Sequence, residues 1–98
     1  MRKRLLLLLT MLLPMVTMAD PVEINGICYN LIDKGSVAEV TSNPKSYIGD
    51  IVIPETIEYE DVNYKVEIIG AEAFAYSSIT SISIPNSVKK VRRDAFIY

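Results

Sequence analysis

The chain has 98 residues, with one cysteine, no histidine, no tryptophan and a formal net charge of −2. A single cysteine excludes an internal disulfide, and the lack of histidine removes the commonest general base and metal ligand. We therefore expect a small domain held together by packing, without enzyme activity, a cofactor or a bound metal.

Residues 1–19 have the pattern of an export signal. Arg2-Lys3-Arg4 is basic, Leu5 to Met18 is apolar, and Thr17-Met18-Ala19 resembles a small-residue cleavage motif. A helix of these 14 apolar residues would span about 21 Å, less than the roughly 30 Å membrane core. We predict a cleaved signal peptide, no transmembrane anchor in the mature chain, and a secreted or bacterial cell-surface location.

The predicted mature chain, residues 20–98, is acidic. It carries 7 Lys and Arg against 12 Asp and Glu, a net charge of −5. This charge disfavours nucleic acid as a partner. Residues 20–61 contain 9 acidic and 2 basic residues, whereas residues 62–98 contain 3 acidic and 5 basic residues. The basic cluster is interpreted as a solvated turn, with an anionic glycan or membrane patch as the alternative; it comprises Lys89, Lys90, Arg92 and Arg93.

Residues 20–50 are predicted to form a β-meander that caps the amino-terminal end. Asn25-Gly26 separates two short apolar runs and suits a type I′ turn, in which both central residues have positive φ. Residues 37–41 provide a partner strand, and Pro44 marks the loop that follows. Cys28 lies in the apolar alternation and is interpreted as a small buried hydrophobe, with a reactive or intermolecular thiol as the alternative.

A repeat follows. Residues 66–76 align with residues 88–98 at a spacing of 22, with four identities. A fixed period of this size predicts a solenoid, so residues 51–98 are expected to hold a complete repeat at 66–87 and a truncated repeat at 88–98. Residues 51–57 align with residues 82–88 at a larger offset of 31. A hairpin insertion at about residues 58–65 accounts for the excess.

The two halves of the repeat have different periodicities. Ile82 and Ile84 alternate with serine and predict a short strand ended by Pro85. The spacings of three, four and one between Val66, Ile69, Ala73 and Phe74 predict a short helical turn, which makes the fold class mainly β with short helical turns. Stacked repeats should place Phe74 beneath Phe96. The predicted repeat core comprises Val66, Ile69, Ala73, Phe74, Ile79, Ile82, Ile84, Val88, Val91, Ala95 and Phe96.

The segment from Ile69-Gly70 to Ala73-Phe74, followed by Ser77 to Val88, resembles the repeat of BspA-like leucine-rich repeat proteins, an exported and largely bacterial family. The region before it is similar to the amino-terminal module of that family, so the resemblance covers a module and about one and a half repeats. Two positions depart from the pattern: Arg92 replaces the usual glycine, and Asn86 precedes the usual asparagine position by one residue.

The resemblance implies a non-catalytic scaffold for adhesion-type recognition, with a host matrix protein, a cell-surface protein or a glycan as partner. Tyr59 and Tyr64 could form an exposed binding pair, although we favour packing across a hairpin. The acidic run Glu58, Glu60 and Asp61 lacks the spacing of a calcium loop. The alternative function is a structural cap or fragment of a longer array. In that case the uncapped carboxyl end could self-associate.

Overall fold

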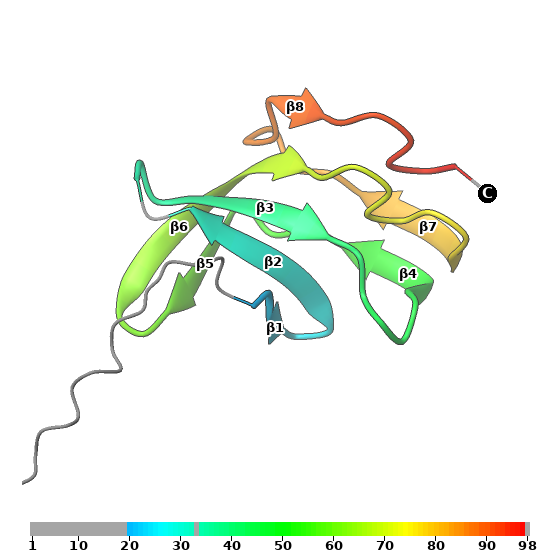
Figure 1. Ribbon diagram of the computed structural model, residues 1–98, viewed down its shortest axis with the longest axis horizontal. Helices are drawn as coiled ribbons and strands as arrows, with labels where there is room; N and C mark the ends of the chain where they lie inside the picture. The colour runs from blue at the N-terminus through cyan, green and yellow to red at the C-terminus, as the bar shows by residue number, and fades with distance from the viewer. Residues whose placement is uncertain (1–19, 33, 98) are drawn as a thin grey trace, which may run out of the picture.

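The computed structural model describes residues 20–32 and 34–97 (Figure 1). The predicted signal peptide at residues 1–19 lies outside the described residues. Within the described ranges the chain contains β-strands and no helix, and hence no helix long enough to cross a membrane. The strands are β1 Val22–Ile24, β2 Ile27–Ile32, β3 Val37–Thr41, β4 Ile48–Val52, β5 Thr56–Tyr59, β6 Val62–Ile69, β7 Ser78–Ser83 and β8 Lys90–Val91.

The first three strands form an antiparallel meander. β1 and β2 pair around Asn25 and Gly26, whose φ angles are 51° and 86°. These positive values suit asparagine and glycine, and they confirm the hairpin predicted at this dipeptide. β2 then pairs antiparallel with β3, with Tyr29 opposite Val40.

The later strands stack in parallel and form two sheets. In the larger sheet, β6 pairs with β3 and with β8, which places Ile69 next to both Val40 and Val91. Ile69 and Val91 are the residues aligned at the spacing of 22. In the second sheet β4 pairs with β7, and Ile51 lies next to Ile82, which is 31 residues further along the chain. Figure 1 shows β4 and β7 side by side at one end of the molecule.

A hairpin of β5 and β6 occupies residues 56–69. Its tip is formed by Glu60 and Asp61, with φ angles of 51° and 67°. β5 pairs with the first half of β6, from Val62 to Lys65, whereas β8 pairs with Ile68 and Ile69. The insertion predicted at residues 58–65 thus lies in this hairpin, and the rest of β6 remains available for parallel stacking.

The predicted helical turn is wrong. Val66 and Ile69 belong to strand β6, as expected for β-branched side chains. The turns that follow are closed by the N–H of Ala73, which donates to Gly70 O at 3.2 Å, and by the N–H of Ala75, which donates to Glu72 O at 3.2 Å. Glu72 has a φ of 59°, and a left-handed residue at this position prevents the chain from continuing as a right-handed helix.

The same turns recur 22 residues later. The N–H of Ala95 donates to Arg92 O at 3.3 Å, and Asp94 has a φ of 60°. The two turn segments, residues 70–76 and 92–97, are joined by the N–H of Phe74, which donates to Ala95 O at 2.7 Å. The N–H of Tyr76 donates to Ile97 O at 2.8 Å in the same way. Repetition in the sequence therefore corresponds to repeated backbone geometry and to direct stacking.

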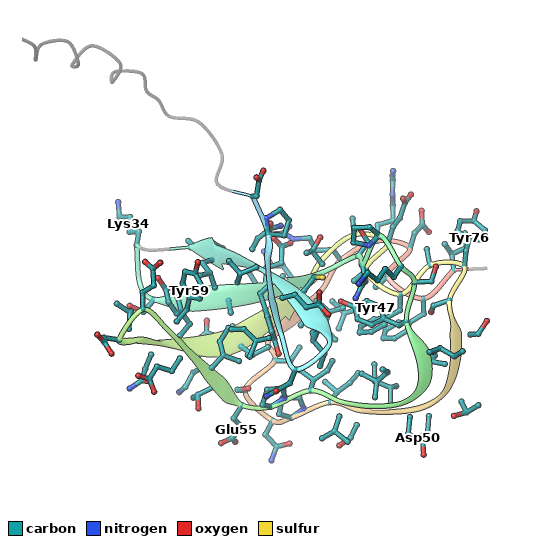
Figure 2. The ribbon with its side chains drawn as sticks, turned by 90° about the horizontal axis from the view of Figure 1, so that it is seen from below. Lys34, Tyr47, Asp50, Glu55, Tyr59 and Tyr76 are labelled. Carbon is teal, nitrogen blue, oxygen red and sulfur yellow. The ribbon has the colours of Figure 1, made fainter. Side chains whose placement is uncertain are left out.

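A cluster of three aromatic rings, which we call the aromatic stack, packs beneath these turns and consists of the stacked pair Phe74 and Phe96 and the tilted ring of Tyr47. The rings of Phe74 and Phe96 lie 5.4 Å apart with an interplanar angle of 6°, which confirms the predicted stacking. The ring of Tyr47 is tilted by 41° against that of Phe74, with ring centroids 4.6 Å apart. Phe74 is 1% exposed and is the central ring. Figure 2 shows Tyr47 directed into the interior.

The predicted core residues differ in burial. The side chains of Val66, Ile69, Ala73, Phe74 and Ala95 are fully buried, and those of Ile79, Ile82, Val88 and Phe96 are partly buried against them. Ile84 and Val91 are instead 40% and 52% exposed, contrary to the prediction. Both belong to the last stacked segments, on which no further strand packs within the described part of the chain.

Candidate recognition surface

Tyr59 and Tyr64, the candidate binding pair for which packing across a hairpin was favoured, differ in exposure. Tyr64 is only 5% exposed and lies in the core, opposite Ile57 of β5. Tyr59 is partly buried and packs against the same core (Figure 2). Both line a hollow of about 680 Å³ together with Val22 and Leu31. Their rings therefore serve packing across the hairpin.

Three members of the basic cluster contact carboxylates. Lys89 Nζ lies 3.8 Å from Glu67 Oε2, a pair that links β6 to the segment stacked on it. Arg92 Nε donates to Glu39 Oε2 at 3.1 Å, and Glu39 Oε1 also accepts a hydrogen bond from Asn30 Nδ2 at 3.3 Å. Exposed pairs of this kind contribute about 0–1 kcal/mol each.

The other two members differ from each other. Arg93 Nε lies 3.6 Å from its neighbour Asp94, and Lys90 is exposed on β8. Because three of the four cations lie beside carboxylates, the cluster fits a solvated turn better than an anion-binding patch.

Tyr47 forms a buried link that the sequence analysis did not single out. Its hydroxyl donates to Thr41 O at 2.7 Å and accepts a hydrogen bond from the Cys28 N–H at 3.0 Å. Burial raises the pKa of Tyr47 well above its ordinary value. The side chain thereby ties the loop after β3 to β2 and to the aromatic stack. The turn before it, Asn43-Pro44-Lys45, shares no motif with the repeat, so no sequence signal marked it.

Cys28 is 5% exposed, and burial raises the pKa of its thiol. We expect iodoacetamide at pH 8 to modify Cys28 at least about tenfold more slowly in the native chain than in urea, because both access and the thiolate fraction are reduced. Mass spectrometry of the alkylated fraction over time measures this ratio. Equal rates with and without urea would show that Cys28 is a reactive thiol.

Two of the three most exposed large apolar side chains among the described residues lie on the smaller sheet; the third is Tyr76. Ile48 and Val52 of β4 are 76% and 69% exposed, whereas Ile53, which faces the other side, is 2% exposed. Asp50 lies between them and points outward (Figure 2). We call this surface the β4–β7 face; it consists of Ile48, Asp50, Val52, Ser78, Thr80, Ser81 and Ser83.

Hydrogen bonds across the two strands order the centre of this face. Asp50 Oδ1 accepts from Thr80 Oγ1 at 2.6 Å and from Ser81 Oγ at 2.8 Å. These bonds hold the pKa of Asp50 below its ordinary value, so the carboxylate is ionised at neutral pH. The period of two through Ile48, Asp50 and Val52 could have indicated this face, because Asp50 marks the solvent side of the strand.

Two solved structures share this fold. A leucine-rich repeat protein from Bacteroides ovatus matches 76% of the chain with a TM-score of 0.68 and 29% sequence identity. This chain has the fold of leucine-rich repeat proteins. A leucine-rich cell-surface protein from Faecalibacterium prausnitzii matches 80% of it with a TM-score of 0.65 and 22% identity. The leucine-rich repeat chain spans 20% and 21% of the lengths of these two proteins.

Sequence comparisons add no narrower assignment. No known family profile matches the leucine-rich repeat chain, and no curated protein does so. Within residues 20–32 and 34–97, no group of three or more His, Cys, Asp or Glu side chains is placed to hold a metal ion. The acidic residues Glu58, Glu60 and Asp61 lie on the β5–β6 hairpin, with Glu60 and Asp61 at its tip.

Proposed function

We propose that this leucine-rich repeat chain is a non-catalytic scaffold that is exported and recognises a protein or glycan at the bacterial cell surface. The observation that carries the proposal is the β4–β7 face. Ile48 and Val52 leave most of their surface in water on either side of the ionised Asp50. Exposed aliphatic side chains beside ordered polar groups are typical of recognition surfaces.

A solenoid with a period of 22 residues is part of this proposal. The parallel pairing of Ile69 with Val91 and the stacked turn segments support it. Such an array places equivalent side chains of successive repeats next to each other and so extends the β4–β7 face. The name of the Faecalibacterium protein supports a surface location, and the pattern of residues 1–19 supports export.

A binding screen against matrix proteins and glycans tests the recognition role. A partner that binds the unmodified chain should not bind the double variant I48S/V52S, because this variant lacks the exposed aliphatic surface and keeps the core intact. Val62→Ser is the matched control, since Val62 is 42% exposed on the β5–β6 hairpin. The role of this face would be contradicted if the unmodified chain retained no partner more strongly than I48S/V52S does.

A structural role in a longer array is the second candidate function. It is favoured by the last stacked segment, where Val91 and Ile97 are 52% and 41% exposed and the ring of Phe96 closes the aromatic stack. A further repeat or a second copy of the chain would cover these side chains. Sedimentation over a range of concentrations tests self-association at this end, and Val91→Lys should then shift the chain towards monomer.

A further inference from the structure

We propose that the free edge of β4 binds an extended cationic peptide, which adds as a third strand to the β4–β7 sheet. This inference rests on the proposed recognition function and names a ligand class and a site for it. In strand addition, main-chain hydrogen bonds supply affinity and alternate side chains supply specificity.

The two sheets differ in whether the strand that comes first in the parallel stack, β3 or β4, has a free edge. In the larger sheet, the edge of β3 that faces away from β6 pairs with β2, and β2 in turn pairs with β1. In the smaller sheet β4 pairs with β7 alone, as far as residues 20–32 and 34–97 extend. An uncovered strand edge presents N–H and C=O groups to any chain that can pair with it.

The hydrogen bonds to β7 show which groups of β4 face this open edge. Tyr47 O accepts from the Ser78 N–H at 3.0 Å, and the Ile53 N–H donates to Ser83 O at 3.0 Å. The C=O and N–H of one trans peptide point in opposite directions. The N–H of Ile48 and the C=O of Val52 therefore point away from β7, so a donor and an acceptor lie at the two ends of the free edge.

The free edge of β4 is bordered by hollows. Two hollows of about 280 and 340 Å³ follow it and share Asn25, Ile27 and Val52. Their opposite wall is the β1–β2 turn, which lies next to β4 (Figure 1). An incoming strand would lie about 4.8 Å from β4, between that strand and the turn.

The residues that line the two hollows indicate the charge and the side chains of the peptide that would bind there. Their only charged residues are Asp50 and Glu58, and neither hollow is lined by Lys or Arg. The exposed side chains of Ile48 and Val52 flank Asp50 on the same strand. A peptide in which basic and aliphatic residues alternate would place its cations near the carboxylates and its aliphatic groups against these two side chains.

Fluorescence anisotropy with a defined probe tests the inference on the full chain. The probe is a labelled, end-blocked peptide of about six residues, the usual length of a strand, in which Lys and Val alternate. One comparison peptide replaces each Lys with Glu. A second carries an N-methyl group on every residue, which removes the main-chain donors without changing the side chains. Saturable binding of the Lys–Val peptide alone is expected.

Two substitutions locate the site on β4. In an extended strand the N–H and the C=O of one residue point to the same edge, so the N–H of Val52 faces the open edge together with its C=O. Val52→Pro removes this N–H without removing a bond to β7, and it should weaken binding roughly tenfold. Asp50→Asn removes the charge and keeps an acceptor for Thr80 and Ser81, and it should weaken binding about two- to fivefold. Asp61→Asn makes the same change of charge on the β5–β6 hairpin, outside both hollows, and should leave binding unchanged.

Equal binding of the N-methylated or the Glu–Val peptide would overturn the inference, even if Val52→Pro failed to fold. Concentration-dependent dimerisation that Val52→Pro abolishes would also overturn it and assign the edge to a second copy of the chain. A partner from the binding screen that is lost by I48S/V52S but retained by Val52→Pro would leave the recognition role in place and remove only the strand-addition site.

Discussion

Replacing Phe74 with Ala should remove most of the stability of this fold, with a loss of about 3–5 kcal/mol in the free energy of unfolding. Phe74 is 1% exposed, and its ring centroid lies 4.6 Å from that of Tyr47 and 5.4 Å from that of Phe96. Truncation leaves a cavity between two stacked segments and breaks both ring contacts. A small domain has a total stability near the lower end of the usual range, about 5 kcal/mol, so much of the variant should be unfolded.

Phe96→Ala is the matched control for this substitution. Phe96 stacks on Phe74 from one side and is only partly buried, so its loss should remain below about 3 kcal/mol. Urea unfolding followed by far-ultraviolet circular dichroism measures both variants. If the two unfold at the same urea concentration, the central position of Phe74 in the stack does not determine stability.

The stacking of Phe74 on Phe96 was predictable because both residues carry the same local signal. Each phenylalanine follows an alanine at the same place in a segment repeated after 22 residues, and stacked repeats place equivalent residues together. The hairpin at Asn25-Gly26 was predictable for a different reason, since that dipeptide meets the backbone requirement of one turn type. Both predictions needed only local sequence and one rule of geometry.

The remaining features depend on contacts that the sequence does not mark. Tyr47 joins the aromatic stack from a turn without the Ala-Phe pair, and β3 joins the parallel sheet at an offset of 29 between Val40 and Ile69. The apolar residues between 66 and 74 are spaced by three and four, as in a helical turn. In the structure Val66 and Ile69 instead pair with neighbouring strands, and the left-handed conformation of Glu72 prevents a helix. The exposed β4–β7 face was not predicted, because Ile48 and Asp50 precede residues 51–57, the segment that aligns with the repeat.

Gly70→Ala should destabilise the fold by about 1–3 kcal/mol through a steric clash with β3. A Cβ at this position would lie 2.8 Å from Glu39 Oε2 and 2.9 Å from Val40 O. The Glu39 side chain can move, but its displacement disturbs the contact with Arg92 at 3.1 Å. Val40 O is a backbone atom held by the N–H of Gly70 at 2.7 Å, so the turn segment must shift away from β3.

Arg92→Ala provides the comparison, because Arg92 occupies the place of Gly70 in the next repeat and tolerates a Cβ while its N–H donates to Ile69 O at 2.8 Å. Its loss removes an exposed contact with Glu39 and should cost at most about 1 kcal/mol. Urea unfolding of Gly70→Ala alone and with Glu39→Ala separates the two sources of strain. The cost of the extra methyl group should fall in the Glu39→Ala background and should not vanish, because Val40 O remains. A Gly70→Ala variant as stable as Arg92→Ala would show that the glycine is not required for close packing against β3.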